Sequence, residues 1–476
     1  MQHASRQARL SALAVAVVGA LAIGNAAASG FQIRENSIKT LGRAFTGTTV
    51  AQDDATVAIT NPAAMTNLTS TTVAVNASFI DLNGDFTGSG VAGAPFATST
   101  NPAVKALARP TTGGNGGDPG DVAPVPSFAV AMPLSGSLEN LWVGFGVNAP
   151  YGLKTEWDKD WVGRYNAVTS DVKVVDATLS AAWKPSDQFS VGAGVIFQRA
   201  EVTLNNALDL GTAVCSQLAA GATTAAGLAA FTSMCLAPTA PYKPGQNDGF
   251  FEVSGKDNGI GFIIGMQWKP TDKLAIGYAY KSEIDHELKG TVDFTAPPNV
   301  LALPGMSARF ADGAGGAALT TPSTHTFSAQ YNVTDAVRLL GEYQRTSWSS
   351  LRNVTIRRAD GTLVGTEDYH WSDSNLYSLG AEFDLSPAFT LRAGLGRDET
   401  PTHDANRTPR LPDNDRTLLS VGATWHATSN LAVDAAFMRV NLKEAPIHSV
   451  SSTGTLLTGK VEGHANIFGI GASYKF

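Results

Sequence analysis

The alternation of side chains along many short segments constrains the fold of this chain more than any other feature. Between Gly259 and Trp268, the even-numbered positions carry large apolar side chains and the odd-numbered positions carry mainly glycine. Successive side chains of a β-strand point to opposite faces, so this period of two predicts one large apolar face and one small or polar face. The alternation recurs at 274–283, 389–396 and 467–476. Both a soluble β-sandwich and a membrane β-barrel are built from such strands.

The connections between the predicted strands distinguish these two folds. Several short polar turns follow directly after an aromatic residue, and they lie at 183–189, 268–274, 331–337, 383–389 and 425–431. Aromatic residues at these places would form the interfacial girdle of a membrane barrel. The other connections are long and lie at 88–123, 206–249, 296–322, 399–414 and 445–458. Short turns on one side and long loops on the other predict a barrel of a Gram-negative outer membrane.

The strands between these turns number about fourteen, an even number as a closed antiparallel barrel requires. We expect this all-β barrel to occupy residues 69–476. Phe476 shares an outward face with Phe468 and Tyr474, which fits a last strand that closes the barrel and is recognised by the barrel-assembly machinery. About eight strands already leave an interior that side chains just fill, so a fourteen-stranded lumen needs a plug or is an open pore.

The N-terminal residues divide into a predicted signal peptide and a predicted plug. Residues 1–28 carry two arginines, an apolar run at 10–23 and a small-residue stretch at 26–28, so we expect cleavage before Ser29. The apolar run is shorter than the roughly 20 residues of a membrane-spanning helix, which disfavours an N-terminal anchor. Residues 29–68 lack sustained alternation and would form a compact hatch inside the barrel; a disordered periplasmic tail is the alternative.

The composition agrees with an exported membrane protein. Only 16% of the residues are charged, compared with about 25% in soluble domains. The formal net charge is −7 and becomes more negative when the signal peptide is removed, so nucleic acid is not expected as a partner.

Several short segments then make a family recognisable. Gly30-Phe31-Gln32, the stretch 41–45, Asp53-Asp54-Ala55 and Asn61-Pro62-Ala63 resemble, in order and spacing, the N-terminal hatch of the long-chain fatty acid transporter family. That family of outer-membrane proteins also includes aromatic-hydrocarbon channels, and the segments 151–165 and 398–416 match it too. The resemblance implies a fourteen-stranded barrel with a hatch. Such a barrel would carry hydrophobic molecules past the polar lipopolysaccharide surface, through a pocket, to a lateral opening into the bilayer.

The resemblance also implies where this opening and its control lie. Asn148, Pro150 and Gly152 interrupt the expected third strand, and proline removes a ladder donor and forces a kink or bulge. This position matches the family's kinked strand, where the wall opens sideways; alternatively, Pro150 only marks the end of a strand. In the family's gating scheme, ligand contact near Phe31 shifts the region of Asn61, Pro62 and Ala63 and opens the route.

A candidate pocket follows from the alternation between 191 and 204. If Ile196 and its even-numbered neighbours face lipid, then Val195, Phe197 and Arg199 face inward, and Arg199 would bind the carboxylate of an amphipathic acid. Simple pairing of Arg199 with Glu201 or with a hatch acid is the alternative. Fatty-acid members of the family often carry Trp-Lys-Asp where this chain has Trp371-Ser372-Asp373. The missing cation leaves a neutral alkane, aromatic hydrocarbon or ester open as the substrate.

The two cysteines lie in the long connection 206–249. In an oxidising compartment we expect Cys215 and Cys235 to form a disulfide, which stabilises the loop by ~3 kcal/mol in the chain-entropy model. Apolar residues of the same loop would form short helices at the barrel mouth, either capturing hydrophobic ligands or packing against neighbouring loops.

Enzymatic functions find little support. The sequence has no G-x-S-x-G motif, and its eight histidines are scattered, so we expect no enzyme, no metal and no cofactor. A P-loop-like stretch at 454–460 is a chance match, because Val461 stands where a Ser or Thr is needed. A diffusive porin or a surface receptor or adhesin remain alternatives to a transporter. The protein is expected to be a monomer whose partners are its hydrophobic substrate, outer-membrane lipid and lipopolysaccharide.

Overall fold

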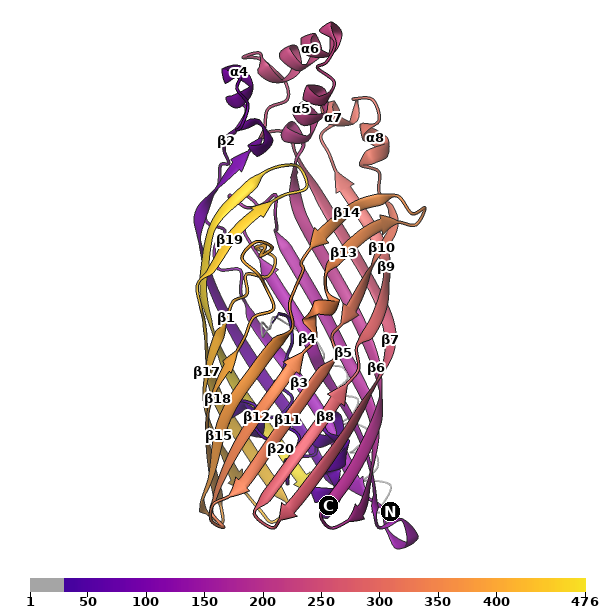
Figure 1. Cartoon of the computed structure of the whole chain (residues 1–476), viewed down its shortest axis with the longest axis vertical. Helices are drawn as coiled ribbons and strands as arrows, with labels where there is room; N and C mark the ends of the chain where they lie inside the picture. The colour runs from indigo at the N-terminus through magenta and orange to yellow at the C-terminus, as the bar shows by residue number, and fades with distance from the viewer. Residues whose placement is uncertain (1–29) are drawn as a thin grey trace, which may run out of the picture.

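The computed structural model describes residues 30–476, so the predicted signal peptide and cleavage site lie outside the described residues. Within this range the strands form one antiparallel sheet that closes into a tall barrel (Figure 1). Closure occurs at β1 (Thr72–Ala92), which pairs with β20 (Leu456–Lys475) on one side and β3 (Val122–Pro133) on the other. Over residues 30–476 the chain crosses the barrel wall fourteen times, as the sequence predicts.

The wall consists of single strands and of pairs of consecutive strands that continue one another. The remaining single strands are β4 (Leu141–Glu156), β5 (Thr169–Ser186), β6 (Phe189–Asp209), β7 (Asp248–Thr271), β16 (Phe389–Asp398) and β17 (Arg416–His426). The paired strands are β8 (Leu274–Lys281) with β9 (Ile284–Thr295), β10 (Gly313–Thr321) with β11 (Thr324–Asn332), β12 (Val337–Thr346) with β13 (Asn353–Arg358), β14 (Leu363–Asp368) with β15 (Ser374–Ser386), and β18 (Leu431–Leu442) with β19 (Ala445–Val450).

The predicted short turns all lie at the lower end of the barrel in Figure 1. They join β5 to β6, β7 to β8, β11 to β12, β15 to β16 and β17 to β18. The aromatic residues that precede these turns are exposed on the outer surface: Trp183, Trp268, Tyr331, Phe383 and Trp425. An exposed aromatic ring beside a short turn is the arrangement expected at the periplasmic membrane interface.

The opposite end carries the long loops and the short helices. These elements are η2 (Ala94–Phe96), α4 (Pro102–Lys105), β2 (Arg109–Pro110), α5 (Leu210–Ala220), α6 (Ala225–Phe231), η4 (Thr232–Leu236), α7 (Pro298–Leu301) and α8 (Met306–Arg309). Two further short helices lie elsewhere: η5 (Trp348–Ser350) stands between β12 and β13, and η3 (Gly136–Leu138) lies in the β3–β4 turn. The prediction of a long connection at 445–458 is wrong, because β19 pairs with β20 from Ala445–Val461 to Val450–Leu456 and only residues 451–455 join the two strands. None of the helices in the described residues is long and apolar enough to cross a membrane.

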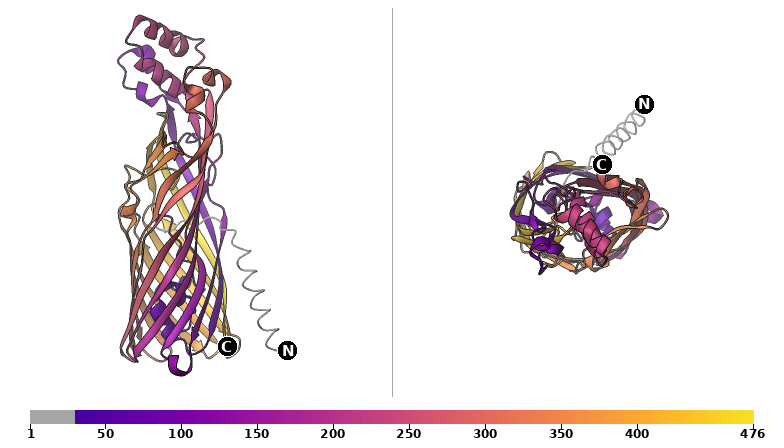
Figure 2. Two further views of the ribbon diagram at one scale, coloured as in Figure 1. Left: turned by 90° about the vertical axis from the view of Figure 1, so that its right-hand side faces the viewer. Right: turned by 90° about the horizontal axis from the view of Figure 1, so that it is seen from above.

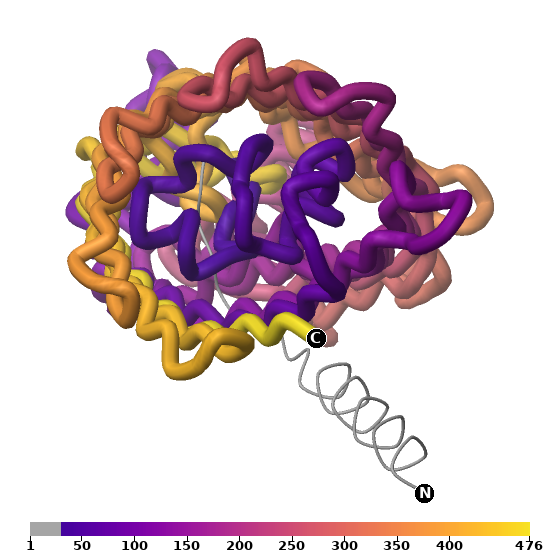
Figure 3. The backbone as a smooth tube through the Cα atoms, turned by 90° about the horizontal axis from the view of Figure 1, so that it is seen from below, coloured from indigo at the N-terminus to yellow at the C-terminus, as the bar shows by residue number. Residues whose placement is uncertain are grey.

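The hatch is a compact segment inside the lower half of the barrel (Figures 2 and 3). It contains α2 (Ile38–Leu41), α3 (Val57–Thr60) and η1 (Pro62–Asn67), and the first strand begins at Thr72 rather than near Thr69. Wall glycines let it pack closely. A Cβ added to Gly422 would lie 2.8 Å from the Cα of Gly42, and one added to Gly265 would lie 1.8 Å from the Asn61 side-chain oxygen. The small face seen in the sequence is therefore the face that receives the hatch.

A buried ion cluster fastens the hatch to the wall. Arg43 of the hatch forms an ion pair with Glu382 of β15, and the same carboxylate accepts hydrogen bonds from Arg392 at 2.6 Å and Arg338 at 2.9 Å. Arg43, Glu382 and Arg392 are all buried. Removing one member of such a cluster leaves an uncompensated buried charge. The body of the hatch is therefore a fixed plug rather than a loosely seated one.

Candidate ligand pocket and lateral gap

The third wall strand, β4, is irregular at the predicted position. Its register with β5 shifts between Asn148 and Tyr151, so the intervening Ala149 and Pro150 form a bulge. Proline supplies no N–H to the ladder and is tolerated in sheets mainly at bulges and edges. Residues 148–153 of β4 are buried, in contrast to the alternating exposure of the strand below. Pro150 therefore lies within the strand and does not mark its end.

Beside this bulge the wall lacks a ladder. In the described chain β3 and β4 pair from Pro133–Trp142 up to Phe128–Val147, and no pairing of the two strands follows above. There β3 still pairs with β1, and β4 still pairs with β5. We call the region between 122–127 of β3 and 148–156 of β4 the lateral gap. Unpaired backbone groups at membrane level must find other partners.

The N-terminal segment supplies some of these partners. The Ile33 N–H donates to the Pro150 carbonyl at 2.8 Å, and the Gly152 N–H donates to the Phe31 carbonyl at 2.8 Å. Gln32 and Tyr151 thus form an isolated antiparallel bridge. Residues 31–33 act as a short strand laid against the bulge from inside the barrel.

Asn36 of the hatch connects the two edges of the lateral gap. Its backbone carbonyl accepts a hydrogen bond from the Ser127 hydroxyl of β3 at 2.6 Å, and its side-chain oxygen accepts one from the Asn148 amide of β4 at 2.9 Å. One residue of the hatch therefore bridges the two strands whose own ladder has ended. This bridge is the lowest connection across the gap above the last β3–β4 pair.

An apolar pocket lies directly above residues 31–33. It is lined by Phe31, Leu153, Val172, Val202, Leu204, Leu288, Leu319, Leu351, Val354, Tyr369, Trp371 and Leu411, together with Ser170 and Arg410. Its volume is about 60 Å³, far below the roughly 300–1,000 Å³ of a typical ligand pocket. In this state the pocket is nearly closed, and a long ligand needs the aromatic side chains to move.

Phe31 forms one wall of this pocket. Its ring packs edge-on against Trp348 with centroids 4.7 Å apart and against Tyr151 at 5.9 Å. The preceding Gly30 donates its N–H to the Asp413 carboxylate at 2.9 Å. Burial raises the pKa of Asp413 above its ordinary value, although Arg416 beside it opposes the rise. The N-terminal segment is thus held at its start by a buried carboxylate and at its end by the bulge.

Arg410 is the buried cation of the pocket. Its guanidinium donates to the Asn206 side-chain oxygen at 2.8 Å and to the Asn205 carbonyl at 3.1 Å, and its Nε lies 3.3 Å from the Glu367 carboxylate. The Nε has no hydrogen-bond partner. A buried guanidinium beside an apolar surface can bind a carboxylate at the end of an apolar chain.

A polar chamber lies on the other side of residues 31–33. It has a volume of about 80 Å³ and is lined by Gln32, Arg34, Asn148, Tyr151, Lys281, Thr324, Thr326, Glu342, Gln344 and nearby residues. Arg34 is already bound to Asp398 at 3.0 Å and to Gln344 at 2.7 Å. The N-terminal segment therefore separates an apolar pocket from a polar chamber that reaches Asn148 and Pro150 at the lateral gap.

The sequence-based pocket on β6 is wrong. Val195 and Phe197 are 46% and 54% exposed and point outward, as does Arg199, whose guanidinium pairs with Glu201 at 2.7 Å. Ile196 faces inward and packs with Ile263 and Ile284. The assignment failed because the large apolar residues of β6 change faces along the strand. Within the apolar band they face lipid, whereas higher up Val202 and Leu204 line the pocket.

The other predicted residues are found in separate places. Asn61, Pro62 and Ala63 pack against the hatch-facing side of β6 and β7. The Asn61 amide donates to the Thr49 carbonyl at 2.7 Å and to the Met266 carbonyl at 3.2 Å. These three residues do not contact the lateral gap, and their gating role stays a prediction. Ser372 is turned away from the pocket: its hydroxyl lies 2.7 Å from His403 Nε2.

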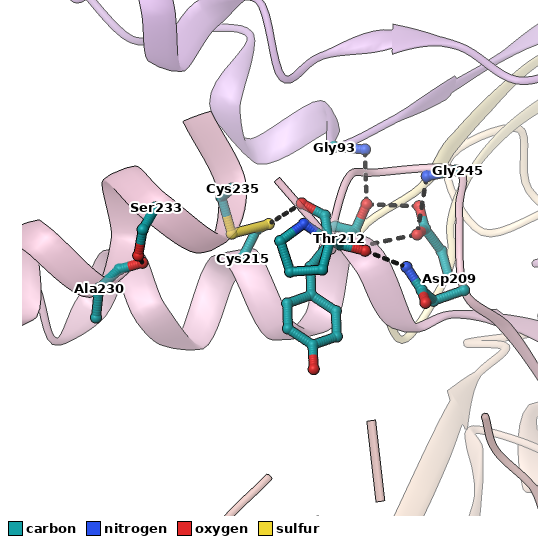
Figure 4. Close-up of a disulfide and its surroundings, with 11 residues drawn as sticks. Gly93, Asp209, Thr212, Cys215, Ala230, Ser233, Cys235 and Gly245 are labelled. Carbon is teal, nitrogen blue, oxygen red and sulfur yellow. Dashed lines mark hydrogen bonds between the residues drawn. A yellow bond between two sulfur atoms is a disulfide. The ribbon is translucent and has the colours of Figure 1, made fainter. Parts of the chain in front are cut away.

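The predicted disulfide between Cys215 and Cys235 is confirmed and joins α5 to η4 (Figure 4). Close by, the hydroxyl of Thr212 accepts a hydrogen bond from the Gly93 N–H at 3.0 Å, while the Thr212 N–H donates to Asp209 at 2.9 Å. The loop after β6 is therefore tied both to itself and to the loop after β1.

The chain matches known proteins over nearly its full length. A family model described as outer membrane protein transport protein (OMPP1/FadL/TodX) matches residues 19–476. The chain belongs to this family. A 47 kDa outer membrane protein of Pasteurella multocida is 30% identical to it over 475 residues, 98% of each chain. The long-chain fatty acid transport protein of Escherichia coli is 26% identical over 482 residues, again 98% of each chain.

Solved structures of the OMPP1/FadL/TodX family share this fold. A Pseudomonas aeruginosa FadL homologue superposes with a TM-score of 0.81 at 25% identity and covers 94% of this chain and 100% of its own. The Pseudomonas putida toluene transporter TodX has a TM-score of 0.63 at 14% identity, covering 92% and 97% of the two chains, which is a likeness of fold. The protein is an outer-membrane β-barrel of a family that transports fatty acids and hydrocarbons.

Two residues of the site were missed by the sequence analysis. Arg410 lies in the matched segment 398–416 but no pattern separates it from the other arginines there. Asn36 lies inside the predicted hatch 29–68, where no motif singles it out. The roles of Arg410 and Asn36 both depend on contacts with residues that are distant in the sequence. The sequence therefore carries no local signal for either residue.

Proposed function

We propose that this protein takes up hydrophobic compounds passively, by ligand-controlled release into the bilayer through the lateral gap. The observation that carries this proposal is the position of residues 31–33. They form one boundary of the apolar pocket and are hydrogen-bonded to the bulge beside the lateral gap. A ligand that displaces Phe31 must disturb the contacts of Gln32 and Ile33 with β4.

The energetics of this control are favourable. The two backbone hydrogen bonds at the bulge contribute about 0.5–1.5 kcal/mol each in net terms. Burial of apolar ligand surface contributes about 25 cal/mol per Å². An acyl chain that enters beside Phe31 thus offsets the loss of these contacts after burying roughly a hundred Å². No energy source is required, so transport follows the concentration gradient.

Arg410 favours an amphipathic acid as the ligand. The carboxylate would bind the guanidinium, and the acyl chain would lie among the leucines and Trp371. Long-chain fatty acids have this chemistry, and a relative of this chain is named for their transport. A neutral hydrocarbon is the second candidate, because the remainder of the pocket lining is almost wholly apolar.

Other functions fit this arrangement less well. A diffusive porin needs an open aqueous constriction, whereas the hatch packs closely against wall glycines such as Gly265 and Gly422. A receptor or adhesin needs only the loops and would not require the contacts of Phe31 and Asn36.

An uptake assay tests this proposal. It measures the uptake of radiolabelled oleate and of radiolabelled toluene by Gram-negative cells that lack their own hydrophobic transporter. Cells that express the chain should take up oleate above the empty-vector rate. Toluene uptake without oleate uptake would make the protein a hydrocarbon channel, and uptake of neither would contradict the proposal in favour of a porin or receptor.

A further inference from the structure

Arginines occupy a recurring position on the outer surface of the barrel. On four strands, the first charged side chain above the outward-facing apolar band is an arginine: Arg199 after Phe197 on β6, Arg345 after Tyr343 on β12, Arg397 after Leu395 on β16 and Arg439 after Phe437 on β18. Arg345 and Arg397 have side-chain exposures of 52% and 65%. At the periplasmic end the comparable cations are lysines: Lys184, Lys273 and Lys475.

Three of these arginines lie at one height. Arg345 of β12 is opposite Asn375 of β15, and Arg397 of β16 is opposite Tyr377, two residues lower on β15. Arg397 is opposite Thr417 of β17, whereas Arg439 of β18 is opposite Leu419. From one arginine to the next, two strands along the wall, the position is thus two residues lower than direct cross-strand pairing would place it. In a barrel whose strands tilt by about 40°, a level plane crosses neighbouring strands with a shift of about one residue each.

The arginines therefore form a level arc. Their strands follow one another around the wall seen in Figure 1. With strands about 4.8 Å apart and a rise of about 3.3 Å per residue, successive arginines are spaced about 12 Å apart between Cα atoms. This spacing lets each guanidinium bind its own anionic group, and the level coincides with the upper edge of the apolar band.

The guanidinium groups keep donors available outside the wall. Arg345 pairs with Asp373 at 2.8 Å, and Arg397 pairs with Asp415 at 3.3 Å. Arg439 contacts only neutral oxygens among its hydrogen-bond partners, those of Asn441 at 3.0 Å and Asn466 at 2.8 Å. A guanidinium has five N–H donors, so each of the three can also bind a phosphate, for which its planar fork is well suited.

We propose that Arg345, Arg397 and Arg439 form a binding site for the phosphate groups of lipopolysaccharide in the outer leaflet. The occupant is a glycolipid with phosphates on a disaccharide directly above its acyl chains. The acyl chains would lie along the apolar band over Tyr343 and Phe437, and the phosphates would meet the arc at its edge. The site is independent of the substrate that the barrel transports.

The test uses the purified full-length barrel in detergent, titrated with bis-phosphorylated lipid A and with dephosphorylated lipid A, and counts bound lipid by native mass spectrometry. The variant R345Q/R397Q/R439Q should bind lipid A at least about tenfold more weakly than wild type, because three charge-assisted contacts are lost. Wild type should bind the dephosphorylated lipid as weakly as this variant binds lipid A. Equal binding of both lipids by wild type would overturn the proposal, whether or not the variant folds.

Two matched variants serve as controls. K184Q/K273Q/K475Q removes the same number of charges at the periplasmic end and should bind lipid A as wild type does. R345K/R397K/R439K keeps the charges and should retain most of the binding. If either control lost as much lipid A binding as R345Q/R397Q/R439Q does, the result would contradict a phosphate site on the arc. Heat-modified migration on gels reports the folding of each variant.

Discussion

At the scale of single residues, three side chains connect separate parts of the site. Phe31 contacts the pocket, Asn36 contacts both edges of the lateral gap, and Arg410 places a cation beside an apolar lining. The sequence indicated Phe31 through the family resemblance. It could not indicate the other two, because their partners are distant in the chain and only the closed barrel brings them together.

We expect Arg410 to set a preference for a carboxylate. In Arg410→Ala, the dissociation constant for oleate should rise by about 10- to 100-fold, since a hydrogen bond to a charged group contributes about 1.5–3 kcal/mol. The dissociation constant for decane should stay the same. Fluorescence titration of the purified protein measures both. Arg199→Ala is the control and should leave both values unchanged, because Arg199 faces outward; equal loss of oleate binding in both variants would contradict this assignment.

We expect the two hydrogen bonds to Asn36 to restrain the lateral gap. The double variant S127A/N148A removes one contact from each edge, at about 1 kcal/mol apiece, so the open population should increase by up to about 30-fold. Oleate uptake by cells should become faster. The matched variant S78A/N83A changes the same residue types on β1, which do not contact Asn36, and should behave as wild type. Slower or unchanged uptake in S127A/N148A would show that Asn36 does not restrain the gap.

At the scale of elements, alternation identified strands well but did not always identify their faces. In the segment 260–268 the even-numbered large residues are exposed on the outer surface, which agrees with the single large apolar face predicted there. On β6 the odd-numbered Phe197 faces lipid, whereas the even-numbered Leu204 lines the pocket. The assignment of the even-numbered large residues of this strand to the lipid face therefore failed. The strand continues beyond the membrane, where the environments of its two faces are reversed. The sequence contains no separate mark of that boundary.

The disulfide stabilises the loop after β6 rather than the barrel. In C215S/C235S, protease added to intact cells should cleave this loop much faster, because a loop closed by about 20 residues is stabilised by about 3 kcal/mol. The half-life of the loop on immunoblots measures this effect. The heat-modified migration of the barrel should not change. A half-life equal to that of wild type would show that packing of α5 and α6 alone holds the loop.

At the scale of the whole molecule, strand number, turn positions and the hatch were predictable because each leaves a local pattern. Aromatic residues before short turns, such as Trp183 and Trp268, marked the periplasmic end. The pairing of β19 with β20 and the end of the β3–β4 ladder were not predictable, since strand partners and gaps depend on register around the closed wall. The ion cluster around Glu382 likewise joins segments far apart in the chain.

We infer that transport requires residues 31–33 to leave the bulge of β4. Gln32 and Tyr151 form a non-hydrogen-bonded antiparallel pair, whose Cα atoms lie about 4.5 Å apart, within the range of a disulfide. In cells that express Q32C/Y151C, oxidation should therefore reduce oleate uptake to the empty-vector rate.

The most direct measurement is this uptake before and after dithiothreitol, with wild type and Y151C alone treated in parallel. Reductant should restore uptake in Q32C/Y151C to the rate of Y151C. Wild type should keep its rate throughout, including after its own Cys215–Cys235 bond is reduced. Uptake by the fully oxidised double variant at the rate of Y151C would contradict the account, because ligand would then be passing while residues 31–33 stay fixed to the wall.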